Sequence, residues 1–338
     1  MKKHVNIPVF IPHYGCPNDC VFCNQRKITG KPCYDKNAVI NEIEAALSTV
    51  DVRCTEVELA FFGGSFTAIP REEMLGLLEV SDLFISRGAI SSVRLSTRPD
   101  AITPEILGIL KAHGVKTVEL GLQSFSDTVL SACRRGHTSA QSEIACALIK
   151  EYGFDLVGQM MVGLPCSTVE DEIMTARRIC ELGCDGARIY PTVVFPDTAL
   201  MDMKNSGQYT PLTTEQAVLR TADVIKVLAL SDVKIIRIGL CANETLRDAD
   251  FADNYHPAIG ELALSRHYRD RMESLLSSLT ADISGKEAVF TVARGRISQA
   301  VGQKRGNILY LKGRFSLGSI KVREDFNLSA FSLSLDIN

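Results

Sequence analysis

The sequence predicts an α/β protein, a partial (β/α)6-type parallel barrel followed by a small α+β unit. Short apolar runs alternate with longer helical patterns over the first 240 residues, as in parallel sheets with crossover helices. The dinucleotide fingerprint G-x-G-x-x-G is missing after the first run, which disfavours a doubly wound open sheet. The pattern changes beyond a long apolar-periodic segment at 257–281. We therefore expect a core at 1–245 and a second unit at 246–338.

The predicted elements of the core alternate regularly along the chain. Thr103 before Pro104, and Thr168 three residues before Asp171, are typical of helix N-termini. Loops after the strands of such barrels build the active site, so we expect the functional motifs directly after strand ends. The expected strands are 7–12, 56–62, 92–97, 116–122, 155–162, 186–191 and, less regularly, 233–238, and the expected helices are 36–49, 70–86, 103–113, 138–152, 168–182 and 213–230.

Composition excludes several classes of protein. The 338 residues are 46% hydrophobic and carry a net charge of -3, which is ordinary for a globular chain. No run reaches the roughly 18 apolar residues of a membrane span, and no signal-peptide core follows the N-terminus. We therefore expect a cytoplasmic protein with no membrane partner. Its eleven cysteines are expected to be reduced thiols, some of them metal ligands.

Three of these cysteines follow the first predicted strand with the spacing Cys-x3-Cys-x2-Cys, at Cys16, Cys20 and Cys23. Three thiolates on one loop can hold three corners of a 4Fe-4S cluster and leave one iron open to a ligand. The alternatives are a zinc site that takes Cys33 as its fourth ligand, or thiols without a ligand.

This loop, with Phe22 before the third cysteine, resembles the radical SAM superfamily. Over about residues 5–220 the chain is similar to the radical SAM domain of the Elongator catalytic subunit and of oxygen-independent coproporphyrinogen dehydrogenases. The shared motifs follow successive strands and are Gly63-Gly64-Ser65, Thr97 to Asp100, Gln123-Ser124, Arg135-Gly136-His137-Thr138, Gly163-Leu164-Pro165 and Arg188 to Thr192.

The resemblance implies a set of cofactor sites. It assigns one 4Fe-4S cluster to Cys16, Cys20 and Cys23, with S-adenosylmethionine bound at the open iron. Two residues depart from the pattern. Ser96 stands where these relatives usually have glutamate, and Gln159 stands where the porphyrinogen enzymes have aspartate. The residues expected at the cofactor are Phe22, Gly63, Gly64, Ser65, Ser96, Gln123 and Arg135.

The C-terminal unit contains a strongly basic segment. From Lys286 to Arg323 there are nine Lys or Arg and one acid, Glu287, a net +8 that leaves -11 for the rest of the chain. Two short helices predicted within 289–323 flank a glycine turn, and the segment resembles the KH module, whose GXXG loop clamps single-stranded nucleotides. A lid or dimer element with a solvated basic face is the alternative. The candidate RNA-binding residues are Gly302, Lys304, Arg305, Lys312 and Arg314.

Together these resemblances imply a radical SAM enzyme that modifies tRNA or another RNA. They also imply an electron donor such as flavodoxin or ferredoxin. We expect no acetyltransferase domain like that of the Elongator subunit within these 338 residues, so we do not carry over the wobble-uridine chemistry of that protein. Two alternatives are a small-molecule radical enzyme similar to coproporphyrinogen dehydrogenase and a non-catalytic iron-sulfur RNA-binding protein.

Overall fold

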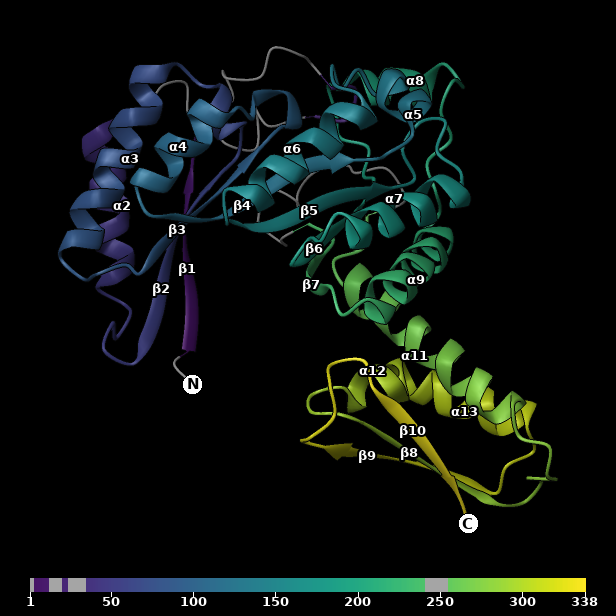
Figure 1. The fold of residues 1–338 in the computed structure, drawn as a ribbon. Helices are drawn as coiled ribbons and strands as arrows, with labels where there is room; N and C mark the ends of the chain where they lie inside the picture. Colours follow the sequence, from purple (N-terminus) through teal and green to yellow (C-terminus); the bar gives the residue numbers. More distant parts are fainter. Residues whose placement is uncertain (1–2, 12–19, 24–34, 241–254) are drawn as a thin grey trace.

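The computed structural model describes residues 3–11, 20–23, 35–240 and 255–338. Seven parallel strands form one sheet in the order β1-β2-β3-β4-β5-β6-β7, and the sheet curls into a half-barrel (Figure 1). The predicted α/β barrel is therefore confirmed, and the less regular seventh run is a strand paired with β6. The strands are β1 (Lys3–Phe10), β2 (Thr55–Phe62), β3 (Ser92–Thr97), β4 (Val115–Gln123), β5 (Asp155–Val162), β6 (Gly186–Pro191) and β7 (Lys234–Ile238).

Amphipathic helices connect these strands and cover the outer face of the sheet (Figure 1). Their buried side chains and those of the strands form one large apolar core. Threonine hydroxyls cap the first turns of several helices, as at Thr168, whose Oγ1 accepts from the backbone N–H of Asp171. The main helices of this part are α2 (Lys36–Leu47), α3 (Arg71–Ser86), α4 (Pro104–Ala112), α6 (Ser139–Glu151), α7 (Val169–Glu181) and α9 (Thr214–Leu230).

Four short helices at the rim of the barrel were not predicted. The 3-10 turns η1 (Phe66–Ala68) and η2 (Pro99–Ala101) follow β2 and β3, and the helices α5 (Asp127–Ala132) and α8 (Ala199–Asn205) follow β4 and β6. A helix of three to seven residues is too short to show a 3.6-residue periodicity, so tertiary packing decides its conformation.

The C-terminal part folds on a second sheet with its own apolar core. Its strand order is β10-β8-β9, with β9 parallel and β10 antiparallel to β8. Helix α11 packs on α9 and also on α12 and α13, so it joins the two sheets (Figure 1). The elements are α11 (Ile259–Ser277), β8 (Glu287–Ala293), α12 (Ile297–Val301), η3 (Gln303–Arg305), α13 (Gly306–Arg314), β9 (Ser319–Asp325) and β10 (Leu333–Ile337).

Two features of this part bear on the predictions. Strand β10 was not predicted, although its residues alternate between apolar and polar, and it completes the second sheet.

The proposed boundary between residues 245 and 246 lies outside the described residues. Among the helices that the structure describes, none combines the length and the apolar character of a membrane span.

Candidate functional site

The described part of the cysteine loop is held against the rim of the barrel. The backbone N–H of Val21 donates to the carbonyl oxygen of Cys133 at 3.2 Å, and Val21 in turn accepts from Leu200 at 2.8 Å. These contacts come from the ends of α5 and α8, so the helices that sequence patterns missed anchor this loop. The amide of Cys23 donates to the carbonyl oxygen of Cys20 at 3.0 Å, which folds the two cysteines into a tight turn. Cys16 lies outside the described residues.

Arg135 lies directly beside the buried thiol of Cys20. Its Nη1 donates to Cys20 Sγ at 3.2 Å and its Nη2 donates to the carbonyl oxygen of Gly121 at 2.7 Å. The backbone of Arg135 is held as well, because Arg98 Nη2 donates to its carbonyl oxygen at 2.6 Å. Arg98 is 2% exposed, and the sequence assigned it no role. The structure thus joins the ends of β3 and β4 to the cysteine loop through two buried guanidinium groups.

Gly121 and Gln123 shape the end of β4. Gly121 lies opposite Gln159 in the sheet and Gln123 lies opposite Met160, so Leu122 is an extra residue in the ladder. Such a bulge redirects the following side chain, and Gln123 takes a left-handed backbone with φ of 64°. A Cβ at residue 121 would lie 3.2 Å from Gln123 Nε2 and 3.3 Å from Arg135 Nη2. A side chain at this position would therefore require Gln123 and Arg135 to move away from the strand by a few tenths of an ångström.

Two buried polar atoms beside Gly121 lack a hydrogen-bond partner among the described residues. They are Gln123 Oε1 and Arg135 Nε. Because an unsatisfied buried donor or acceptor is costly, a free acceptor and a free donor beside the cysteine loop fit a polar ligand. This fits the predicted cofactor role of these two residues.

The glycine pair after β2 lies at the neighbouring strand end. Gly63 has φ of 108°, a conformation that side chains rarely adopt, and Ser65 is buried. The turn is tied to β3 by Thr67, whose Oγ1 lies 2.6 Å from Thr97 Oγ1 and donates to the carbonyl oxygen of Ala101 at 2.7 Å. The Gly63-Gly64-Ser65 turn therefore follows the carboxyl end of β2, as the motif predicts.

The inside of the barrel is polar and charged. Glu119 of β4 is fully buried and accepts from both Nε and Nη2 of Arg188 at 2.7 and 2.8 Å. It also accepts from Arg94 Nη1 at 2.9 Å, and Arg94 Nε donates to Glu58 at 2.5 Å. Burial opposes the charge on Arg188, but its hydrogen bonds and attraction to Glu119 prevail and raise its pKa. The negative charges of Glu58 on β2 and Glu119 on β4 are thus balanced by the positive charges of Arg94 on β3 and Arg188 on β6.

The two positions that depart from the family pattern are partners in this network. Gln159 Nε2 donates to Ser96 Oγ at 3.3 Å and to Glu119 Oε2 at 2.9 Å. Two neutral side chains here leave the charge balance around Glu119 unchanged, whereas two acids would add unpaired negative charge. Ser96 therefore belongs to the polar interior of the barrel and contacts β5.

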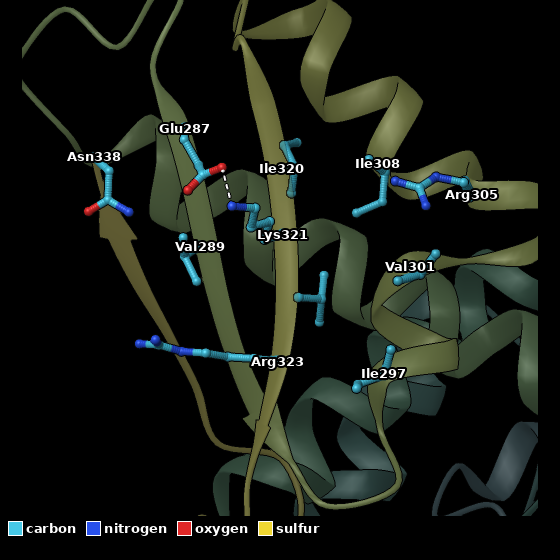
Figure 2. A pocket seen from close by; sticks show the side chains of 11 residues that line it. Glu287, Val289, Ile297, Val301, Arg305, Ile308, Ile320, Lys321, Arg323 and Asn338 are labelled. Carbon is cyan, nitrogen blue, oxygen red and sulfur yellow. Dashed lines mark ion pairs between the residues drawn. The ribbon is translucent and has the colours of Figure 1, made fainter.

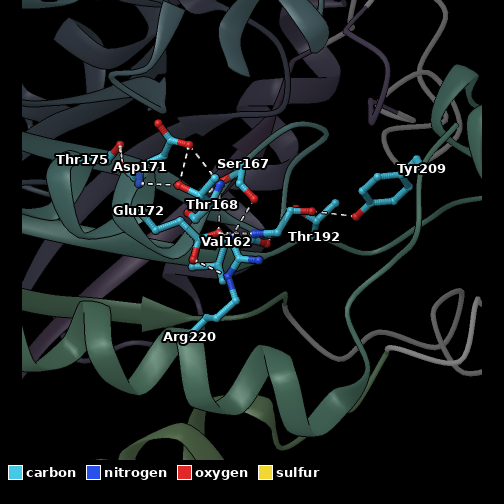
Figure 3. A network of polar contacts seen from close by, with 10 residues as sticks. Val162, Ser167, Thr168, Asp171, Glu172, Thr175, Thr192, Tyr209 and Arg220 are labelled. Atoms are coloured by element: carbon cyan, nitrogen blue, oxygen red, sulfur yellow. Dashed lines mark hydrogen bonds and ion pairs between the residues drawn. The ribbon is translucent and has the colours of Figure 1, made fainter. Parts of the chain in front are cut away.

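The loop after β5 is fixed by a second buried network (Figure 3). Glu172 accepts from the backbone N–H of Gly163 at 2.6 Å and from Arg220 at 2.6 and 2.8 Å. Tyr209 donates to the carbonyl oxygen of Gly163 at 2.6 Å. Burial outweighs these hydrogen bonds and raises the pKa of Glu172. The Gly-Leu-Pro turn is thus held through both the backbone N–H and the carbonyl oxygen of its first residue, Gly163.

Two further buried groups lie at the mouth of the barrel. Burial lowers the pKa of His137 to about 4, and the charge of Arg135 adds to this effect. Burial also raises the pKa of Cys133 to about 12, with a contribution from the nearby Cys20. Both groups are therefore neutral at pH 7, and Arg135 supplies the positive charge beside Cys20.

The candidate RNA-binding residues lie in the C-terminal part and do not join this site. Gly302, Lys304 and Arg305 form the turn between α12 and α13. Lys312 and Arg314 lie on α13, where Arg314 Nε pairs with Glu273 at 2.5 Å.

A parallel half-barrel whose first strand leads to a cysteine loop, with a guanidinium at a cysteine sulfur, defines an α/β-barrel class of protein with a cysteine site at the carboxyl ends of its strands. Residues 10–179 match the model of the radical SAM superfamily, and residues 184–269 match the radical SAM C-terminal domain. The chain belongs to the radical SAM superfamily.

Curated relatives include proteins with and without an assigned activity. An uncharacterised protein of Methanocaldococcus jannaschii is 27% identical over 68% of this chain and 73% of its own length. A tRNA uridine(34) acetyltransferase of the same organism is 32% identical over 37% of this chain and 24% of its own length. Elongator complex protein 3 of Saccharomyces cerevisiae is 28% identical over 46% of this chain and 31% of its own length. The chain thus matches less than a third of these two larger relatives.

Solved structures share the fold. The Elp3 protein of Methanocaldococcus infernus superposes with a TM-score of 0.63 at 20% identity, over 81% of this chain and 64% of that protein. Coproporphyrinogen III oxidase of Escherichia coli, a radical SAM enzyme, superposes with a TM-score of 0.50 at 19% identity, over 68% and 53% of the two chains. Both likenesses confirm the curled parallel sheet.

The residues at the cysteine loop fit the cluster and cofactor that this superfamily implies. Cys20 and Cys23 lie on one turn, and thiolates are the ligands that iron-sulfur clusters require. The Arg135 guanidinium at Cys20 Sγ offsets the negative charge of a thiolate ligand. The unsatisfied Gln123 Oε1 and Arg135 Nε can receive polar groups of a cofactor bound beside the cluster.

Proposed function

We propose that the protein is a radical SAM enzyme that cleaves S-adenosylmethionine and modifies tRNA or another RNA. The observation that carries the first part is the contact between Arg135 and Cys20, at the strand ends where barrel enzymes hold their active sites. Cys16, Cys20 and Cys23 would hold one 4Fe-4S cluster. When reduced, such a cluster would supply one electron for the cleavage of S-adenosylmethionine to methionine and a 5'-deoxyadenosyl radical able to take a hydrogen atom from the substrate.

The residues of the chain have binding and positioning roles in this proposal. Arg135 and Gln123 receive the polar groups of the cofactor, and the Gly63-Gly64 turn offers backbone N–H and C=O groups to its methionyl end. Glu119 and its arginine partners keep the barrel interior in one polar arrangement. An external electron donor such as flavodoxin or ferredoxin completes the system.

Two observations support RNA as the class of substrate. Relatives over part of this chain carry names that refer to tRNA uridine(34) or to Elongator. The segment from Lys286 to Arg323 carries a net +8, and polyanion binding is the usual use of such a segment. The cytoplasm, where tRNA and reduced thiols are found together, is the proposed location.

The test measures 5'-deoxyadenosine after anaerobic reconstitution with iron and sulfide, followed by dithionite and S-adenosylmethionine, with and without bulk tRNA. We expect product that increases with tRNA, and none from Cys20→Ala. Product that does not respond to tRNA would leave a radical enzyme and reject RNA in favour of a small molecule. No product from a chain that contains its cluster would reject the enzyme and leave an iron-sulfur RNA-binding protein.

A further inference from the structure

Arg98 is a buried cation beside the cysteine site whose role the sequence motifs do not explain. It is 2% exposed, and arginine is almost never fully buried unless it is paired. It directly follows β3, and Pro99 after it favours the extended backbone that Arg98 adopts, with φ of -110° and ψ of 152°. The side chain therefore starts from a restricted main chain, and its contacts indicate its role.

One contact of Arg98 fixes the main chain of Arg135. Arg98 Nη2 donates to the carbonyl oxygen of Arg135 at 2.6 Å. From the other side, the backbone N–H of Arg135 donates to the carbonyl oxygen of Leu130 at 3.0 Å. Both backbone polar groups of Arg135 are thus bonded, which limits the positions that its guanidinium can reach. In the structure this guanidinium lies at Cys20 Sγ.

A second contact balances the charge of Arg98. Its Nε donates to Asp100 Oδ1 at 2.5 Å, and the two side chains form an ion pair. Arg135, in contrast, has no ion pair with any residue that the structure describes, and its guanidinium donates to Cys20 and to the carbonyl oxygen of Gly121. The positive charge that faces the cysteine loop is therefore that of Arg135, and Arg98 contributes a hydrogen bond rather than charge.

We propose that Arg98 is a positioning residue that holds the guanidinium of Arg135 at Cys20 by fixing the main chain of Arg135. A guanidinium presents several N–H donors in one rigid plane, so it can bond a carboxylate and a carbonyl oxygen at the same time. A lysine ammonium has no such fork. The inference rests on the proposed function, because the cluster is the group that the charge of Arg135 would serve.

The experiment measures the midpoint potential of the reconstituted cluster in the full-length chain by EPR-monitored redox titration. The test variant is Arg98→Gln with Asp100→Asn, which removes the ion pair but leaves the net charge unchanged. We expect a more negative potential, because a displaced Arg135 no longer stabilises the reduced cluster. Arg98→Lys keeps the pair with Asp100 and should cause a smaller shift, and it replaces the test variant if that chain does not fold. An unchanged potential would overturn the inference.

A double-mutant cycle determines whether Arg98 acts through Arg135. In a chain that already carries Arg135→Gln, the changes at Arg98 and Asp100 should cause no further shift of the potential, because residues that act through one contact are not additive. An equal shift in both backgrounds would overturn the inference and leave Arg98 a structural residue.

The control removes a similar ion pair from the second sheet. Arg323 of β9 lines a groove of about 630 Å³ beside that strand (Figure 2). It donates from Nε to Thr291 Oγ1 and from Nη2 to Asp336, each at 2.9 Å. Arg323→Gln with Asp336→Asn should leave the potential unchanged. A shift equal to that of the test variant would mean that the loss of any ion pair changes the potential, and would overturn the inference.

Hydrogen exchange tests the same contact without a cluster. The amide of Arg135 is bonded to Leu130, so its exchange rate measures how often this turn opens. In the cluster-free chain the test variant should increase that rate about tenfold, as the loss of one hydrogen bond to a charged group would. The same rate in the test variant and the parent chain would contradict the role of Arg98.

The outcomes distinguish this inference from the proposed function. If the parent chain cleaves S-adenosylmethionine but the Arg98 variants keep its potential, the inference is wrong and the enzyme stands. If the potential shifts as expected but the parent forms no 5'-deoxyadenosine, the role of Arg98 stands and the enzyme is rejected. If the chain takes up no cluster, the proposed function is rejected, and hydrogen exchange alone decides whether Arg98 holds Arg135.

Discussion

The guanidinium of Arg135 donates a hydrogen bond to the sulfur of Cys20 at 3.2 Å, although 115 residues separate the two in sequence. Gly121 favours the contact, because a Cβ there would lie 3.3 Å from Arg135 Nη2 and the guanidinium would have to shift by a few tenths of an ångström. The contact also requires α5, because that helix leads directly to Arg135 and holds Val21 through Cys133. The cysteine loop is thus coupled to the end of β4.

Removal of this guanidinium should lower the reduction potential of the cluster. Hydrogen bonds and positive charge at ligand sulfurs stabilise the reduced form, so Arg135→Gln should make the midpoint potential more negative. Arg135→Lys keeps the charge and should have a smaller effect. An EPR-monitored redox titration measures both. The exposed neighbour Arg134, changed to Gln, is the control, and an equal shift in that variant would contradict the role of Arg135.

Iron binding should depend on Cys20 and not on Cys184. Cys20 lies on the three-cysteine loop, whereas Cys184 is buried in the core, where a hydrogen bond with Cys146 and burial raise its pKa. Cys20→Ala should therefore lose the cluster, and Cys184→Ala should retain it. Iron and sulfide per chain after anaerobic reconstitution are the measurement. Exposed Cys54→Ala sets the baseline, and comparable iron loss in the Cys20 and Cys184 variants would refute the assignment.

Neutralisation of Glu119 should destabilise the barrel. Glu119→Gln leaves Arg188 buried without its carboxylate, and loss of one partner of a buried ion pair costs about 3–5 kcal/mol. Urea unfolding of the chain without cluster measures the free energy of unfolding. The control is Glu56→Gln, which neutralises an exposed acid on β2 on the same strand face as Glu58. This variant should change the free energy of unfolding very little. A loss below about 1 kcal/mol for Glu119→Gln would mean that the network is not a major source of stability.

The free energy of unfolding should decrease in mild acid because His137 and His267 are buried in their neutral form. Burial, with the nearby charges of Arg271 and Lys226, lowers the pKa of His267 to about 4, against about 6.5 in an unfolded chain. Between these values the unfolded state binds the proton and the native state does not. The free energy of unfolding therefore decreases as the pH falls from 6.5 to 4, by roughly 3 kcal/mol for this group.

The variant His267→Gln should show a weaker pH dependence of unfolding over this range. The matched control is His113→Gln, at a partly exposed histidine whose Nδ1 lies 2.7 Å from Asp82. Urea unfolding at pH 7 and pH 5 compares the two variants with the parent chain. If the slope against pH is the same in His267→Gln and the parent, the titration of His267 does not contribute to acid sensitivity.

Local patterns were sufficient for much of the fold. The strand from Ser92 to Thr97 and the capped helix after Thr168 have the predicted bounds within one residue, because burial alternation and capping act over a few neighbouring residues. The short helices α5 and α8 could not be predicted, since too few residues carry their periodicity. They form because the cysteine loop packs on them.

The sequence alone determined the superfamily, because the cysteine spacing and the order of the motifs depend only on the order of residues along the chain. Which residues act together was decided by tertiary structure. The Arg98 contact with Arg135, the pairing of Ser96 with Gln159 and the groove beside β9 join residues on different strands and helices. Such contacts depend on register, curl and burial, which arise only when the sheets close over their cores.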